Sequence, residues 1–256
     1  MLELGEALSL ADLIETAHVA EKQLDGLVWF RGHADCDWSL IPSAHRRHPA
    51  LESQFANHFR LRAPSLSANC PGHMDYVSWL PLMQHYGIPT RLLDWTESLL
   101  FAAFFAITKK SQRVSATIWM LAPSKLNELS IGHLIPFLTD ERIKPVVTAA
   151  FSGAASHESH ESQHSISVLA PRTDRRMAAQ LGNYTIHGNR DPLELHPASS
   201  RFLARVIIPE TSHGRINADL SVSGVKLSSL FPDLANLASE IAELKAIGPD
   251  GEDLET

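Results

Sequence analysis

Several features that mark common protein classes are scarce in this sequence. It has 2 cysteines among 256 residues, Cys36 and Cys70, without the spacing of a metal site, so a reducing cytosol fits and a disulfide framework does not. Its net charge is −7, which provides no basic stripe to track a phosphate backbone and disfavours a dedicated nucleic-acid binder. Its longest apolar run, residues 99–107, is far shorter than the ~20 residues of a membrane span. We therefore expect a soluble protein with no membrane partner.

Two further classes are disfavoured by the N-terminus and by the glycines. The first residues are acidic and amphipathic rather than basic and then apolar, which argues against a signal peptide and favours a cytoplasmic location. No glycine-rich loop of the kind that cradles phosphate is present, and regular βαβ alternation is lacking. A doubly wound parallel sheet is therefore the less favoured architecture.

Length and composition allow one large domain or two small ones, and we expect one domain over residues 1–248 because the motifs described below span the chain. A chain of 256 residues with 44% hydrophobic content can bury a sizeable core. Residues 152–165 are rich in Ser, His and Glu, and we expect them to form a mobile surface loop. The acidic residues 249–256 are expected to form a disordered tail.

Three histidines of the polar loop, His157, His160 and His164, are spaced three and four residues apart. They could share one face and bind a transition metal if the loop became helical. Because this stretch is highly polar, it offers no buried groups to orient metal ligands, and we expect no metal site. A metal-dependent hydrolase built on these histidines is the least favoured of three functional hypotheses.

The apolar pattern predicts an α+β fold, with a helix-rich N-terminal half and a central mixed or antiparallel sheet. Ser9 can cap a helix that ends before Gly26, and residues 27–32 and 115–121 have the β-branched and apolar character of strands. Further strands are predicted at residues 166–170, 184–187 and 202–208. Further helices are predicted at residues 49–62, 75–80 with a fresh turn at Pro81, 99–107, 137–150, 172–179, 216–220 and 234–244.

The segment from Met83 to Ala106 combines polar and buried character more closely than any other part of the chain. Gly87 and Pro89 break a helix that ends at Tyr86, and Thr96 starts the next one, so Thr90, Arg91 and Asp94 are expected on a tight connector. The following helix, residues 99–107, has no polar face and must be buried. Arg91 and Asp94 either form a structural ion pair that holds this turn or belong to a site.

This segment resembles the signature of the FRG domain family. The resemblance is carried by Gln84-His85-Tyr86-Gly87-Ile88-Pro89-Thr90-Arg91-Leu92-Leu93-Asp94-Trp95 and by Phe30-Arg31-Gly32. It also includes residues 33–46, 180–182 and 230–238, and it covers most of the chain from residue 28 to about residue 244. The family is in turn similar to ADP-ribosyltransferases, which often have an aromatic-Arg-Gly at the end of their first core strand. The resemblance implies an ADP-ribosyltransferase-like fold and transfer of ADP-ribose from NAD, in a toxin or phage-defence effector.

The resemblance also implies roles for individual residues. Arg31 would anchor the dinucleotide phosphates, Tyr86 would stack on a ring, and Thr90 with Gln180 would contact the ribose or the acceptor. The candidate catalytic residues are Arg31, Tyr86, Thr90, Gln180 and Asp94, and the candidate NAD-binding residues are Arg31, Gly32, His33, Trp38, Gln84, His85 and Arg91. A paired-acidic motif near the late strands is lacking, so Asp94, Glu194 and Glu210 are the carboxylates to test.

Each of these residues also has a structural interpretation. Arg31 could pair with Asp35 or Asp37, Trp38 could belong to the core, and Gln180 could cap backbone amides. The same cavity could hold a nucleotide or peptide in a non-catalytic binding module. The acceptor, whether protein, nucleic acid or small molecule, is not identified by the sequence. A cognate inhibitor is a further partner to consider.

Overall fold

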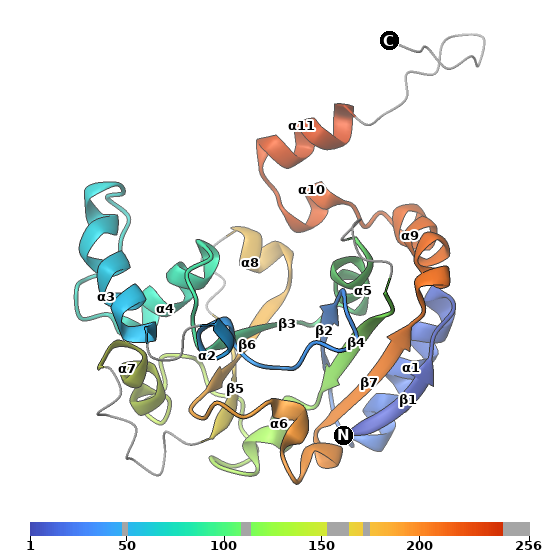
Figure 1. The fold of residues 1–256 in the computed structure, drawn as a ribbon, viewed down its shortest axis with the longest axis horizontal. Helices are drawn as coiled ribbons and strands as arrows, with labels where there is room; N and C mark the ends of the chain where they lie inside the picture. Colours follow the sequence, from blue (N-terminus) through green and yellow to red (C-terminus); the bar gives the residue numbers. More distant parts are fainter. Residues whose placement is uncertain (48–50, 109–113, 153–163, 171–174, 243–256) are drawn as a thin grey trace.

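The computed structural model describes residues 1–47, 51–108, 114–152, 164–170 and 175–242. Its centre is a seven-stranded sheet in the order β1-β7-β4-β2-β3-β6-β5, with helices packed against it (Figure 1). All strand pairs are antiparallel except β1 with β7, so the sheet is mixed and the predicted α+β class is confirmed.

The strands and helices have the following bounds. The strands are β1 (Leu2–Glu6), β2 (Trp29–His33), β3 (Leu92–Thr96), β4 (Ala116–Leu121), β5 (Ser165–Val168), β6 (Gly182–His187) and β7 (Leu203–Ile208). The helices are α1 (Leu10–Gln23), α2 (Ser43–Arg47), α3 (Glu52–Arg62), α4 (Tyr76–His85), α5 (Leu99–Ile107), α6 (Pro123–Asn127), α7 (Lys144–Ser152), α8 (Arg175–Ala179), α9 (His213–Val222), α10 (Leu227–Leu230) and α11 (Leu234–Ala242).

Strand β4 lies inside the sheet, between β7 and β2, and has both faces covered. All six of its residues are buried. Ile118 and Met120 join the core formed with α1, α5 and α9, whereas Trp119 and Leu121 point to the opposite face and pack near α6. A strand buried on both faces needs continuous apolar sequence rather than alternation, which is why residues 115–121 were predictable.

The sheet is nearly divided between β2 and β3. Strand β2 pairs with β4 along its whole length, and β3 pairs with β6 along its whole length, but β2 and β3 share a single residue pair, Phe30 with Thr96. Beyond this pair the two strands diverge. The polar groups of Arg31 and Asp94 are therefore placed at the point where the two halves of the sheet separate.

Gly32 lets helix α5 lie directly on β2. A Cβ atom at this position would be 2.0 Å from the carbonyl oxygen of Ala102 and 2.7 Å from the amide nitrogen of Ala106. No side chain fits there, because both neighbours are backbone. The glycine thus fixes the approach of α5, whose residues Ala102, Ala103 and Ala106 are buried against the sheet.

Several predicted elements are confirmed. Ser9 caps α1, since its hydroxyl accepts a hydrogen bond from the Asp12 amide at 3.2 Å. Helix α5 spans the predicted residues, with Ser98 rather than Thr96 as its N-cap. No helix in the described part of the chain is long and apolar enough to cross a membrane.

Other expectations were wrong. The connector was expected to reach Thr96, but residues 92–96 form strand β3, and Asp94 lies in that strand. Arg31 lies in the middle of β2 rather than at its exit, because the strand continues to His33. Pro81 lies inside α4, which is one continuous helix. Strand β1 was not predicted.

The predicted polar loop and tail fall mostly outside the described residues. Ser152 ends α7 and Ser165 begins β5, so the two ends of the 152–165 segment belong to regular elements. Residues 153–163, with His157 and His160, and residues 249–256 lie outside the described ranges.

Candidate functional site

A cavity of about 390 Å³ opens where β2 and β3 separate. Its volume is within the usual range for small-molecule sites. Its walls come from β2, the following loop, α2, the end of α4, β3, α5, α8 and β6. They are formed by Phe30, Arg31, Gly32, His33, Ala34, Trp38, Arg46, Gln84, His85, Asp94, Trp95, Thr96, Phe105, Arg176, Met177, Gln180, Gly182 and Tyr184.

The Arg31 guanidinium bridges the gap between the two halves of the sheet. Its Nη1 donates a 2.6 Å hydrogen bond to the carbonyl oxygen of Asp94 on β3, and lies 3.9 Å from the Asp94 carboxylate. Its Nε donates to His33 Nε2 at 3.0 Å. Within the described residues no hydrogen bond is made by Nη2, so one edge of the planar group is available to an anion. The alternative pairing with Asp35 or Asp37 is wrong.

His33 holds Arg31 in place as a neutral ring. Since Nε2 accepts from Arg31, Nδ1 must carry the proton and donate to the Trp38 carbonyl oxygen, 3.1 Å away. Trp119 Nε1 also lies 3.2 Å from Nδ1, but a protonated Nδ1 cannot accept from it. Burial, followed by the charges of Arg31 and Arg46, lowers the pKa of His33 to about 3, against the opposing effect of the Trp38 carbonyl.

Two side chains in series orient the Asp94 carboxylate. The buried hydroxyl of Thr90 donates to Gln84 Oε1, and Gln84 Nε2 donates to Asp94 Oδ2 at 2.8 Å. The Asp94 side chain is 53% exposed, whereas Thr90 is completely buried and does not line the cavity. Thr90 therefore lies behind the lining residue Gln84, and its hydrogen bond fixes the orientation of the Gln84 amide.

The charge of the cavity wall is predominantly positive. Arg31, Arg46 and Arg176 line it, and Asp94 is the carboxylate among the lining residues. Burial lowers the pKa of Arg31 below its ordinary value, with Asp94 opposing and Arg46 reinforcing this shift, but a guanidinium keeps its proton in proteins. Three cations against one anion favour a ligand with more than one negative charge.

Aromatic side chains lie beside these cations. Trp38 is half-buried and stands edge-on to His33, with ring centroids 6.0 Å apart. Phe105 is half-buried, and Phe231 lies edge-on to it at 6.0 Å and beneath the Arg176 guanidinium at 4.5 Å. Tyr184 is only 1% exposed, which leaves Trp38 and Phe105 as the better surfaces for a ligand ring.

Arg91 lies on the other side of the backbone from the cavity. Its Nε and Nη2 donate to the two carboxylate oxygens of Glu52 at 2.9 and 2.6 Å, and its Nη1 donates to the Val146 carbonyl at 3.0 Å. The predicted ion pair between Arg91 and Asp94 is therefore wrong. Arg91 precedes β3 and points toward α3 and α7, whereas Asp94 points into the cavity.

The remaining predicted site residues divide between the cavity and its surroundings. Gln84, His85 and Gln180 line it. Gln180 Nε2 donates to the Leu230 carbonyl at 3.0 Å, so its side chain joins α8 to α10 rather than capping amides. Tyr86 is 65% exposed, lies outside this cavity and packs against Phe59, with ring centroids 6.0 Å apart.

Of the three carboxylates that the sequence singled out, Asp94 lines the cavity. Glu194 instead accepts a hydrogen bond from the Leu40 amide at 3.1 Å. Glu210 begins a short turn of 3₁₀-helix after β7 and lines neither described cavity. Asp94 is therefore the carboxylate that can act on a ligand held by Arg31.

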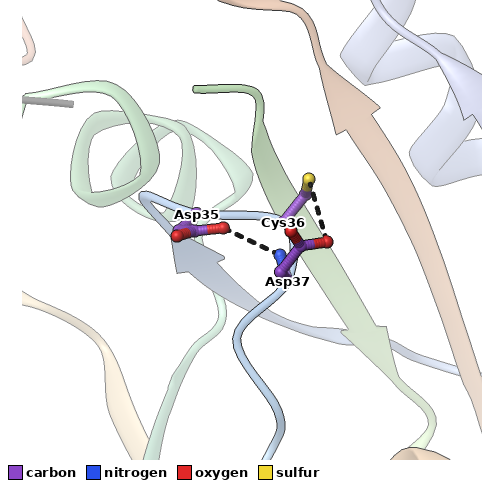
Figure 2. A group of neighbouring side chains, drawn as sticks. All are labelled: Asp35, Cys36 and Asp37. Carbon is purple, nitrogen blue, oxygen red and sulfur yellow. Dashed lines mark hydrogen bonds between the residues drawn. The ribbon is translucent and has the colours of Figure 1, made fainter. Parts of the chain in front are cut away.

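Asp35, Cys36 and Asp37 offer three potential metal-ligand atoms within 4.8 Å of one another (Figure 2). Figure 2 shows Asp35 turned toward the backbone amide of Asp37, which donates to it at 2.9 Å. This hydrogen bond closes a local turn and accounts for the clustering. Burial and the two neighbouring carboxylates raise the pKa of the Cys36 thiol, which disfavours the thiolate that a metal needs.

Residues 26–115 match the model of the FRG domain. This match supports the resemblance to the FRG domain family over these residues. The matched region includes Arg31, His33, Gln84 and Asp94, whereas the walls contributed by α8 and β6 lie beyond it. Comparisons with curated proteins and with solved structures found no match.

Glu52 was missed by the sequence interpretation. It lies in the first turn of α3, where an acidic residue is usually solvent-exposed, yet it is 5% exposed. A signal was present, because Glu52, Ala56 and Arg60 recur every four residues and are the buried residues of that helix. A polar residue in such a series requires a buried partner.

Proposed function

We propose that the protein binds NAD in the cavity lined by Arg31 and transfers its ADP-ribose to an acceptor. The observation that carries this proposal is the Arg31 guanidinium at the division of the sheet, aligned by His33 and by the Asp94 carbonyl and with one edge turned to the cavity. A planar, prealigned guanidinium suits the bidentate binding of a phosphate. The similarity of the FRG signature to ADP-ribosyltransferases supplies the choice of NAD.

The diphosphate of NAD would lie against Arg31, with Arg46 and Arg176 neutralising its second charge. The half-buried rings of Trp38 and Phe105 offer flat surfaces to the adenine or the nicotinamide. Because His33 is neutral, its Nε2 can accept the hydrogen bond from Arg31, and this bond keeps the guanidinium oriented.

The transfer breaks the bond between ribose C1′ and the nicotinamide nitrogen. The bonding electrons leave with nicotinamide and the ribose gains oxocarbenium character. A nucleophile of the acceptor then bonds to C1′ and gives up its proton to water. Asp94 would stabilise the developing positive charge, and Gln84 and Thr90 hold its carboxylate in one orientation.

A non-catalytic nucleotide-binding module is the second candidate function. It is favoured by the 3.9 Å separation between Arg31 Nη1 and the Asp94 carboxylate, because a carboxylate already paired with a cation stabilises an oxocarbenium less. Release of nicotinamide separates this candidate from the transferase.

The binding test is calorimetry with NAD on the unmodified protein and three variants. We expect Arg31→Lys to bind about tenfold more weakly, because Lys keeps the charge and loses the planar fork, and Arg31→Ala to show no binding. Arg142→Lys is the matched control, since Arg142 pairs with Asp140 on the surface and does not line the cavity. Unchanged affinity in Arg31→Ala would remove the proposal.

The catalytic test is chromatography of nicotinamide released from NAD. Asp94→Asn should still bind NAD but release nicotinamide roughly 100-fold more slowly than the unmodified protein. Undiminished release by Asp94→Asn would exclude Asp94 from the chemistry. NAD binding without release by the unmodified protein would select the non-catalytic module.

We extend the proposal to a toxin or phage-defence effector that acts in the cytoplasm. The likeness to ADP-ribosyltransferases supports this role, and the two free cysteines, Cys36 and Cys70, fit a reducing compartment. Its partners would be an acceptor, whether protein, nucleic acid or small molecule, and a cognate inhibitor.

A further inference from the structure

A second cavity of about 590 Å³ lies between α3, the turn that follows it and the end of α4. It shares no lining residue with the cavity that contains Arg31. The two cavities lie against successive residues of one segment: Gln84 and His85 face the first, and Tyr86 faces the second. The proposed chemistry makes no use of this second cavity.

The wall of the second cavity is largely apolar. Its apolar side chains are Phe55, Phe59, Leu66, Leu82, Tyr86 and Ile88. Leu66 is 88% exposed and Tyr86 65% exposed, so large apolar groups are left to water around a concave surface. Covering such a leucine removes apolar surface from water, which makes an apolar occupant favourable.

The charged group of the wall is an arginine. Arg62 lines the cavity together with the polar residues His58, Ser67 and Asn69, and no acidic residue is among its lining residues. In the part of the chain that the structure describes, the Arg62 guanidinium forms no hydrogen bond or ion pair. An arginine beside apolar rings, without an acidic partner, complements a ligand that joins a hydrocarbon body to one negative charge.

We propose that the second cavity binds a free amphiphilic carboxylate, with its hydrocarbon or aromatic body against Phe59 and Leu66 and its carboxylate at Arg62. A concave volume of about 590 Å³ suits a small molecule, whereas a bilayer would require a flat or protruding apolar surface. The proposal is independent of NAD binding, because the two cavities share no lining residue.

The experiment compares octanoate with octan-1-ol by calorimetry on the full chain. The two probes share a hydrocarbon tail and differ in charge. We expect octanoate to bind about fivefold more tightly than octanol, and Arg62→Gln to remove that difference without weakening octanol.

Leu66→Ser should weaken both probes about tenfold, because it removes apolar wall. Leu61→Ser is the matched control: Leu61 is 73% exposed and does not line the cavity, so binding should be unchanged. Both side chains are largely exposed, so neither change threatens folding.

Four results would overturn the proposal. Equal binding of octanoate and octanol would remove the role of Arg62, and no binding of octanoate would remove the site. If the unmodified protein sediments with anionic phospholipid vesicles and Leu66→Ser does not, the surface binds membranes instead. A dimer of the unmodified protein that Leu66→Ser dissociates would assign it to a second copy of the chain.

Discussion

The buried pair between Glu52 and Arg91 leads to the sharpest stability prediction. Glu52 is 5% exposed and Arg91 is completely buried, and two hydrogen bonds join the guanidinium to both carboxylate oxygens. Glu52→Gln keeps the shape of the side chain and removes its charge. The Arg91 guanidinium would then remain buried with the Val146 carbonyl and one amide oxygen as acceptors.

Leaving one member of a buried ion pair without its counter-charge typically costs about 3–5 kcal/mol. For a domain of this size, each 1 kcal/mol lowers the melting temperature by roughly 2–4 °C. Glu52→Gln should therefore lower it by about 10 °C. Glu141→Gln is the matched control, because Glu141 is 84% exposed and pairs with the exposed Lys144, a pair worth less than about 1 kcal/mol.

Urea denaturation followed by circular dichroism gives the free energy of unfolding, and a thermal melt gives the melting temperature. The reasoning fails if Glu52→Gln and Glu141→Gln differ by less than about 1 kcal/mol. Asp94→Asn adds a second comparison. An Arg91–Asp94 pair would have made this change costly, but the 53% exposed Asp94 side chain should tolerate it.

Two further predictions concern Tyr86 and His33. Tyr86→Ala should leave NAD affinity unchanged and weaken octanoate binding several-fold, because Tyr86 lines the second cavity and not the first. A large loss of NAD affinity would instead assign Tyr86 to the NAD site. The pKa of His33 is about 3 in the folded protein and 6.5 for an ordinary histidine. Between these two pH values the unfolded state binds a proton that the folded state does not, so the free energy of unfolding falls as the pH falls. At pH 5 His33 should account for a loss of roughly 2 kcal/mol relative to pH 7, measured by urea denaturation, and His33→Gln should show a shallower pH slope. An equal slope in His33→Gln would show that His33 does not cause it.

The parts of the fold that were predictable from sequence carry their own local signal. Helix α5 is apolar on every side, and β4 is apolar along its length, so burial alone specifies both. Helix α1 has a capping serine and a single buried face. None of these three predictions required knowledge of a distant residue.

The elements that were missed depend on distant partners. Strand β3 is five residues long, lies between a helix breaker and a helix cap, and becomes a strand because β6 pairs with it. Strand β1 likewise depends on parallel pairing with β7, some 200 residues along the chain. The Arg91 partner lies on α3, and the nearer Asp94 was the natural but wrong choice from sequence alone.

The FRG signature combines a scaffold and a candidate site within a few residues. Arg91 turns inward and joins α3 and α7 through Glu52 and the Val146 carbonyl. Asp94 turns into the first cavity, where Gln84 orients it. Gln84 is in turn held by Thr90, so the scaffold and the cavity meet at one amide side chain.

This arrangement assigns folding stability to Arg91 and action on a ligand to Asp94, whereas the sequence interpretation treated the two residues together. Loss of the Arg91 charge partner should act on folding, because that pair is buried away from the cavity. Loss of the Asp94 charge should act on a bound ligand, because Asp94 is exposed to the cavity and to solvent. Gln84→Leu would uncouple them: the fold should persist while the Asp94 carboxylate loses its fixed orientation, so any reaction at that carboxylate should slow without a matching fall in stability.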